Sequence, residues 1–204
     1  MCANAKMGRS KRSAKARAAY RHHELWERQL VIWLVCSYWD VGWANRLQRE
    51  ARAEGINLEV LLVSRTNIVG QLRTAVATGR RALKVLFAPC HGYEDIDEAM
   101  VNLSRNWHRT PPLEGAELSE CAGLLARMAV QSVELLTCCQ GRPPQLAWWV
   151  DQMRSPANRG KHVGAFNYSI RYYWETLNRW IVAGCPTHGF SYQHGYRRCP
   201  IGPL

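Results

Sequence analysis

The segment between residues 56 and 98 constrains the fold most, because it alternates strand and helix patterns. Residues 56–63 begin with alternating apolar and polar side chains and end in an apolar run, which predicts a strand with one or both faces buried. Residues 68–76 place apolar side chains at helical spacing, and residues 83–88 form a second strand-like run that Pro89 ends. The connection is long enough for parallel pairing, but two strands alone make no stable sheet. The segment therefore predicts either a small sheet packed on helices or a sheet that further strands complete.

Most of the remaining chain shows helical periodicity. Apolar and aromatic side chains recur at helical steps over residues 24–53, 96–107, 114–139 and 163–181, and a short helix is expected around Trp148 and Trp149. The predicted fold class is α+β and predominantly helical: a helix bundle with a small β-sheet contributed by residues 56–64 and 82–89. We expect three parts, a basic arm (residues 1–23), a helical globular domain with the small sheet (24–184) and a tail that contains Cys and His (185–204).

The first 23 residues carry positive charge only. They contain seven Lys or Arg residues and no Asp or Glu, in a chain whose formal net charge is +11. Such a run repels itself and offers little apolar surface, so we expect it to order on a polyanion and neutralise phosphates. A solvated tail, a membrane surface or a localisation signal are the alternatives. The residues predicted to bind RNA are Lys6, Arg9, Lys11, Arg12, Lys15, Arg17 and Arg21.

An acidic turn follows the second predicted strand. Cys90-His91-Gly92-Tyr93 leads into residues 94–98, of which all but Ile96 are acidic. Acids suit the first turn of a helix, where they cap N–H groups and complement the helix dipole. A cation site or a docking point for a basic partner is the alternative, although the spacing is not that of a calcium-binding loop.

The eight cysteines lack the regular spacing of a small disulfide scaffold. The sequence shows neither a secretory signal nor an apolar run long enough to span a bilayer. We therefore predict free thiols and a location in the cytoplasm, the reducing compartment of a host cell. The adjacent Cys138 and Cys139 are interpreted as packing residues or reducible thiols at the end of a helix.

The tail has a spacing that suits zinc. Tetrahedral zinc takes thiolates and imidazoles in close pairs and holds together a segment too short to fold alone. The pattern is similar to a nucleic-acid-binding zinc knuckle, with a His as the second ligand and a middle gap one residue longer. The alternative is a tail without any cofactor, packed on the helices and adding a short strand around residues 190–196. The predicted ligands are Cys185, His188, His194 and Cys199.

Two family resemblances follow from short runs. Gly92-Tyr93-Glu94-Asp95 resembles the Gly-Tyr-x-Asp-x-Gly signature of the Oblin proteins, which Obelisks, small circular viroid-like RNAs, encode; Asp97 replaces the last Gly. This resemblance implies a basic helical bundle capped by a small sheet, association with the encoding RNA, a motif formed by Gly92, Tyr93 and Asp95, and no established catalytic role. The run from Trp43 to Leu47, Gly55-Ile56-Asn57 and Val69-Gly70-Gln71-Leu72 together are similar to the first helical pair of tobacco-mosaic-type helical coat proteins, but the strand predicted at residues 58–63 departs from that fold.

The function predicted from these features is non-catalytic RNA binding in association with a small viral or viroid-like RNA genome. Self-association as a coat or nucleocapsid protein is one alternative. Another is a small α/β enzyme with a site near residues 90–97, where Cys90, His91, Asp95 and Asp97 follow a strand end. Cys90 and His91 are neighbours and are expected to point apart, so they do not predict a nucleophile–base pair. The sequence lacks a Gly-rich phosphate loop and a nucleophile elbow, and we therefore predict no enzymatic activity.

Overall fold

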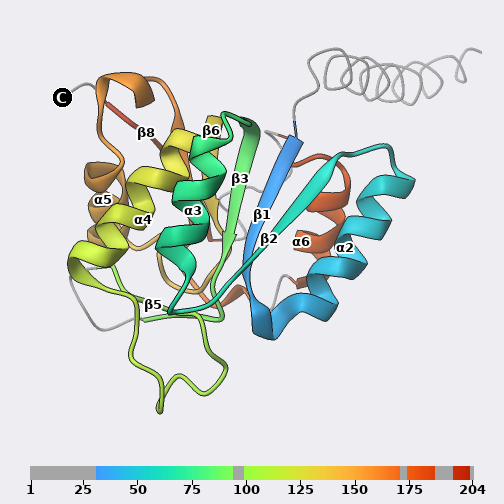
Figure 1. Ribbon diagram of the computed structural model, residues 1–204. Coiled ribbons are helices and arrows are strands. Elements are labelled where there is room, and N and C mark those ends of the chain that lie inside the picture. Colours follow the sequence, from blue (N-terminus) through green and yellow to red (C-terminus); the bar gives the residue numbers. More distant parts are fainter. Residues whose placement is uncertain (1–30, 94–98, 171–173, 187–194, 203–204) are drawn as a thin grey trace, which may run out of the picture. The chain divides into compact units, whose positions relative to one another are not determined.

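The fold, seen in a computed structural model that describes residues 31–93, 99–170, 174–186 and 195–202, is built on a six-stranded sheet (Figure 1). Its strands are β1 (Val31–Ser37), β2 (Leu58–Val63), β3 (Ala82–Ala88), β6 (Ala129–Leu135), β7 (His162–Phe166) and β8 (Tyr196–Pro200). They lie in the order β2-β1-β3-β6-β7-β8, and the first five are parallel, whereas β8 is antiparallel to β7. Two shorter strands, β4 (His91–Gly92) and β5 (Val101–Asn102), form a hairpin outside this sheet.

Helices cover both faces of the sheet. The helices α3 (Ile68–Ala77), α4 (Gly115–Met128) and α5 (Pro143–Gln152) lie on one face, and α2 (Val41–Ala53) and α6 (Trp174–Val182) lie on the other (Figure 1). Two 3-10 turns, η1 (Tyr38–Asp40) and η2 (Pro156–Asn158), complete the described elements. No helix within the described residues has the length and apolar character needed to cross a membrane. The architecture is therefore a three-layer α/β arrangement around a mostly parallel sheet.

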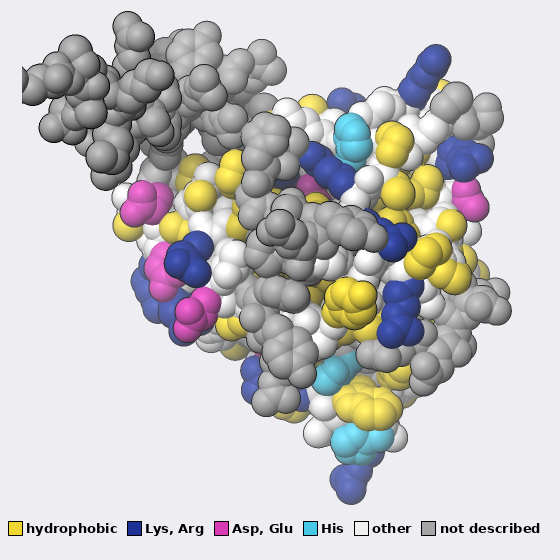
Figure 2. All heavy atoms as spheres, turned by 180° about the vertical axis from the view of Figure 1, so that it is seen from behind, with side chains coloured by type: hydrophobic (Ala, Val, Ile, Leu, Met, Phe, Trp, Pro, Cys, Tyr) yellow, Lys and Arg dark blue, Asp and Glu magenta, His cyan; other side chains and the backbone are white. Residues whose placement is uncertain are grey.

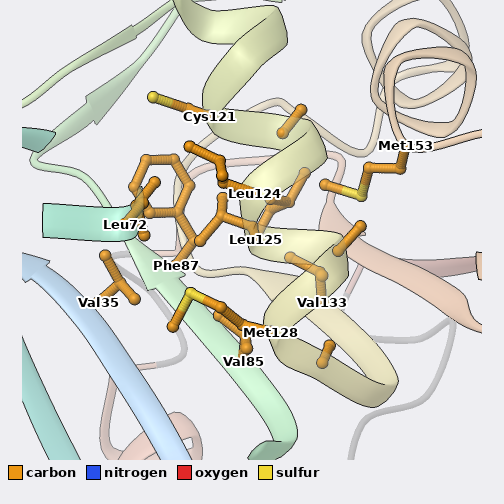
Figure 3. Close-up of a cluster of buried hydrophobic side chains, with 14 of the residues drawn as sticks. Val35, Leu72, Val85, Phe87, Cys121, Leu124, Leu125, Met128, Val133 and Met153 are labelled. Carbon is orange, nitrogen blue, oxygen red and sulfur yellow. The ribbon is translucent and has the colours of Figure 1, made fainter. Parts of the chain in front are cut away.

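The main core lies between the sheet and the α3–α4–α5 layer. Val35 of β1, Val85 and Phe87 of β3 and Val133 of β6 point into a cluster that also holds Leu125 and its helix neighbours (Figure 3). All seven residues of β1 are buried, because this strand has neighbours on both sides and a helix layer on each face. Full burial explains why its sequence is a continuous apolar run instead of an alternating one.

The prediction of a predominantly helical bundle is wrong. Residues 31–37, 129–135 and 163–166 were expected to belong to helices and instead lie in β1, β6 and β7. A strand buried on both faces carries apolar residues at every position, so it satisfies helical spacing as well as strand spacing. The helix expected over residues 96–107 is absent from its described part, residues 99–107, where β5 and turns lie instead. The strands expected at 56–64 and 82–89 are confirmed as β2 and β3, but β1 lies between them.

A buried polar network joins β6 to β8. Glu134 is 1% exposed; its carboxylate accepts hydrogen bonds from Ser132 Oγ, at 2.6 Å, and from Tyr196 Oη, and lies 3.7 Å from the Arg198 guanidinium. Gly164 of β7 pairs with both Glu134 and Arg198, and a Cβ added to it would lie 2.7 Å from Tyr196 Cζ. The network therefore occupies the space that any larger residue at position 164 would need.

Gly164→Ala is expected to destabilise the fold by about 1–3 kcal/mol, because the added methyl group overpacks a closed site. The measurement is the free energy of unfolding in urea. Gly70→Ala in α3 is the control: nothing lies within 4 Å of the added Cβ, so it should be neutral or stabilise by about 0.4–1 kcal/mol. Equal stability of Gly164→Ala and the wild type would contradict the packing described for β7.

Candidate active site

The carboxyl ends of the parallel strands meet at one edge of the sheet. The chain runs from β1 to β2 on one side and returns to β3 on the other side of β1, so the strand order reverses between β1 and β3. In open α/β sheets, ligands bind in the crevice at such a reversal, outside the carboxyl ends of the strands. The residues at this edge are therefore the candidates for a catalytic or binding site.

Two loops at this edge are in direct contact. His91-Gly92 follows β3, and Thr137-Cys138 follows β6, its neighbour in the sheet. A Cβ added to Gly92 would collide with the carbonyl oxygen of Cys138 and would lie 3.1 Å from Thr137 Oγ1. Only a glycine allows the backbone after His91 to approach Cys138 so closely. The fold thus packs the loop that carries His91 against the loop that carries Cys138, although the two are far apart in the sequence.

The environment of His91 favours a neutral imidazole. Burial lowers the pKa of His91 below its ordinary 6.5, while a hydrogen bond to the backbone of Arg105 and the charge of Asp40 work in the opposite direction. That bond favours the protonated ring, and the Arg105 backbone is therefore the group beside the imidazole that can orient it.

The loop after β6 holds two adjacent cysteines in different environments. Cys138 is partly exposed, and its Sγ lies 3.5 Å from Ser169 Oγ. Cys139 is fully buried, has a φ of 65°, and its backbone N–H donates to the Tyr168 carbonyl at 3.4 Å. The loop is anchored by Gly141, whose N–H donates to the Phe166 carbonyl at 2.8 Å. Of the two thiols, Cys138 is the one that a substrate can reach.

The other thiol beside His91 is held in its protonated form. Cys90 Sγ donates to Asp40 Oδ2 at 3.5 Å, and Arg105 Nη2 lies 3.0 Å from Asp40 Oδ1. Burial first, and Asp40 in addition, raise the pKa of Cys90 to about 11. A thiol with such a pKa supplies little thiolate at neutral pH and is a poor nucleophile. The same holds for Cys36 and Cys121, whose pKa burial raises to about 12.

The aromatic side chains near His91 give this edge an apolar character. The Trp107 ring lies 6.2 Å from the His91 ring, 6.0 Å from the Tyr93 ring and 5.5 Å from the His108 ring. In the view from behind, hydrophobic and histidine side chains lie side by side at the lower end of the molecule, where the carboxyl ends of the strands are (Figure 2). The surface beside the candidate base is therefore aromatic, with Lys or Arg side chains at its lowest tip (Figure 2).

Most of the residues predicted as sites lie apart from this pair or outside the described part of the chain. The seven basic residues between Lys6 and Arg21, and Asp95 and Asp97 of the acidic turn, lie outside the described residues. Gly92 is the glycine that contacts Cys138, and Tyr93 Oη accepts a hydrogen bond from Asn102 Nδ2 at 3.3 Å. Of the enzyme residues considered, only His91 and Cys90 can be placed, and Cys90 has the unfavourable pKa described above.

The predicted zinc ligands are described only in part. His188 and His194 lie outside the described residues. Cys185 is fully buried, and burial raises the pKa of its thiol, which opposes metal binding because zinc takes the thiolate. Cys199 lies in β8, and among the described residues no cluster of His, Cys, Asp and Glu suits a metal ion. Zinc binding in the tail stays a prediction.

Cys138 is the residue that the sequence reasoning missed. It was assigned to the last turn of a helix that in fact ends at Met128, with β6 between the helix and the thiol. The sequence offers a signal for this loop and not for Cys138 itself: Cys139-Gln140-Gly141 ends like the caspase run Gln-Ala-Cys-[Arg/Gln/Gly]-Gly, whose cysteine aligns with Cys139 and which has a histidine about 50 residues upstream, as His91 is here. The run departs at its first two positions, where Thr137 and Cys138 stand.

Comparison with known proteins gives no relative: no protein-family model, no curated protein and no solved structure matches the chain.

Proposed function

We propose that the protein is a cysteine hydrolase in which Cys138 is the nucleophile and His91 the general base. The observation that carries this proposal is the close packing of Gly92 against the Cys138 carbonyl. Because Gly92 directly follows His91, this contact places the His91 segment against the loop that carries Cys138. A thiol next to an imidazole that a third group orients is the arrangement that nucleophilic catalysis requires. Here the third group is the Arg105 backbone.

The chemistry follows from these roles. His91 takes the thiol proton as Cys138 Sγ attacks the carbonyl carbon of an amide or ester, forming a C–S bond. His91 then gives that proton to the leaving amine or alcohol as the C–N or C–O bond breaks, which leaves a thioester on Cys138. Water, deprotonated by His91, attacks the thioester, releases the carboxylic acid and restores the thiol.

Analogy with caspases supports a cysteine–histidine pair but not the choice between the two thiols. Caspases pair a cysteine in a Cys-x-Gly run with a histidine about 50 residues upstream, and the cysteine at that position here is Cys139. Such signatures do not transfer between families by themselves, and analogy of fold alone does not give a function. The proposal therefore depends on the contact between the two loops and on the exposure of Cys138, which is partly exposed while Cys139 is buried.

Alkylation of the full chain by iodoacetamide tests the proposal. Neutral His91 is needed to take the thiol proton, so the rate at Cys138 should rise as pH increases through the pKa of His91, which lies below 6.5. In His91→Ala the rise through the His91 pKa should be lost, because no base is left to take the thiol proton. Peptide mapping by mass spectrometry identifies the modified residue at each pH.

The control is the reaction of Cys36 and Cys121 in the same samples. Burial raises the pKa of both thiols to about 12, so they should remain unmodified while Cys138 reacts. Alkylation of Cys138 with the same pH profile in the wild type and in His91→Ala would exclude His91 as its base.

RNA binding is the second candidate function, and it depends on a different part of the chain. The observation that favours it is the run of seven Lys or Arg residues without an acid in residues 1–23. Each phosphate contact adds about −0.7 to −0.9 to the slope of log binding constant against log salt concentration. Deletion of residues 1–23 should therefore reduce the salt slope for single-stranded RNA by several units. An unchanged slope would show that this arm does not contact the RNA phosphates.

A further inference from the structure

Large apolar side chains are exposed around the proposed catalytic pair. Tyr38, Trp39, Trp107 and Tyr168 are 49%, 52%, 47% and 61% exposed, and we call them the aromatic rim. Tyr38 and Trp39 follow β1, Trp107 lies in the loop after β5, and Tyr168 follows β7. Two other large hydrophobic residues are exposed in the described part of the chain. Val41 directly follows η1, at the same edge of the sheet as the rim, whereas Val130 lies near the amino end of β6.

The rim has one member on each side of the catalytic pair. On the base side, the Trp107 ring lies 6.2 Å from the His91 ring. On the thiol side, the Tyr168 carbonyl accepts a hydrogen bond from the N–H of Cys139, and the next residue, Ser169, contacts Cys138 Sγ. A molecule whose carbonyl carbon lies at Cys138 therefore has the Trp107 ring on the base side and the segment that carries Tyr168 on the thiol side.

One charge pair lies beside the rim. Arg105, in the loop that carries Trp107, lies 3.0 Å from Asp40, which directly follows Trp39. Apart from this pair, the rim is defined by its exposed aromatic rings. An exposed aromatic surface of this kind is typical of a binding site for apolar side chains.

We infer that the substrate is an extended polypeptide that carries a large apolar side chain next to the cleaved bond. This inference rests on the proposed function. A polypeptide supplies the amide that the thiol attacks and extends in both directions from it. Its alternate side chains then reach surfaces on the two sides of the pair. A small ester supplies the carbonyl but cannot cover both Trp107 and Tyr168, so it would leave the exposed rim without a role.

The test compares chloromethyl ketones of the form N-acetyl-Ala-Ala-X, where X is Phe, Leu, Gly, Asp or Lys. These probes alkylate a catalytic thiol, and the second-order rate at Cys138 is measured by peptide mapping. Binding a large apolar side chain is expected to favour Phe and Leu over Gly by about tenfold to a hundredfold. Asp and Lys are expected to react no faster than Gly.

Two variants separate substrate binding from an effect on the base. Trp107→Ala changes the surroundings of His91 and can slow all probes together, but only loss of a substrate contact lowers the ratio of the Phe rate to the Gly rate. Tyr168→Ala makes the same comparison on the thiol side. Val130→Ala is the matched control, because Val130 is 38% exposed and lies far from this edge along its strand.

The inference predicts a Phe/Gly ratio of about tenfold or more in the wild type and in Val130→Ala, and a ratio reduced at least threefold in Trp107→Ala or Tyr168→Ala. A ratio near one in the wild type, a faster reaction with Asp or Lys, or a ratio unchanged in both rim variants would overturn it. Iodoacetamide alkylation of Cys138 that depends on His91 would still support the hydrolase in any of those cases. Loss of that dependence would instead refute the hydrolase itself.

Discussion

Cys138→Ala is expected to reduce peptide hydrolysis by at least about 10³-fold, because the variant has no atom at that position that can form the thioester. The measurement is the rate at which wild-type and variant proteins release new amino groups from a mixture of peptides. The free energy of unfolding should change little, since Cys138 is partly exposed and its Sγ makes one weak contact with Ser169. A large loss of activity with a small loss of stability is the signature of a residue that acts in catalysis.

Cys139→Ala is the matched control for this prediction. Cys139 is fully buried, so removal of its sulfur leaves a small cavity and should cost stability, on the order of 1 kcal/mol. The variant retains Cys138 and should hydrolyse peptides to within about tenfold of the wild-type rate, as long as it is folded. Loss of hydrolysis in Cys139→Ala together with full activity in Cys138→Ala would exchange the roles of the two thiols and contradict the assignment made from exposure.

Gly92→Ala should affect both stability and activity. The added Cβ would collide with the Cys138 carbonyl oxygen, a backbone atom that cannot rotate away, so the loops after β3 and β6 must separate. Overpacking of this kind costs about 1–3 kcal/mol, and a displacement of about 1 Å between reacting groups costs about 10²-fold in rate. We expect losses of this size in the free energy of unfolding and in peptide hydrolysis at a temperature where the variant is folded.

Gly123→Ala in α4 is the control for a glycine replacement. Nothing lies within 4 Å of a Cβ added there, and alanine favours a helix more than glycine does. This variant should keep full activity and gain stability. Activity in Gly92→Ala equal to that in Gly123→Ala would mean that the packing of the two loops does not matter for the chemistry.

The strands β2 and β3 could be predicted because each has clear boundaries. The apolar run of β3 is followed by Pro89, and β2 begins with alternating residues after Gly55, which has a φ of 75°. The strand β1 could not be separated from the helix that follows it. No glycine or proline stands where its seven buried residues continue into η1, so apolar spacing alone fits one long helix.

The strand β6 was missed for a similar reason. The helix α4 ends at Met128 and β6 begins at the next residue, again without a turn signal between them. The alternation of Ser132, Val133, Glu134 and Leu135 is a strand pattern, but the buried Glu134 interrupts the apolar face expected of a core strand. Only the pairing with β3 and β7 shows where this polar face packs.

Local sequence patterns could not predict the candidate site, because its two loops come together only through the order of the strands in the sheet. His91 was considered with Cys90, its neighbour in sequence, and that pair was excluded on geometry. The pairing with Cys138 follows only when β3 and β6 are known to be adjacent and parallel, so that the loops at their carboxyl ends meet. The alternative of a site near residues 90–97 named the strand end that carries His91, and it did not consider Cys138 as a partner.

The most direct test of the central claim is cleavage of a tryptic digest of casein in water enriched in ¹⁸O. Hydrolysis of a thioester on Cys138 places one solvent oxygen in each new carboxyl terminus, so mass spectrometry separates new termini from those already present. We predict labelled termini with the wild-type protein and none with Cys138→Ala or His91→Ala. Labelled termini that persist in both variants, or a wild-type protein that produces none, would contradict the assignment of a Cys138–His91 hydrolase.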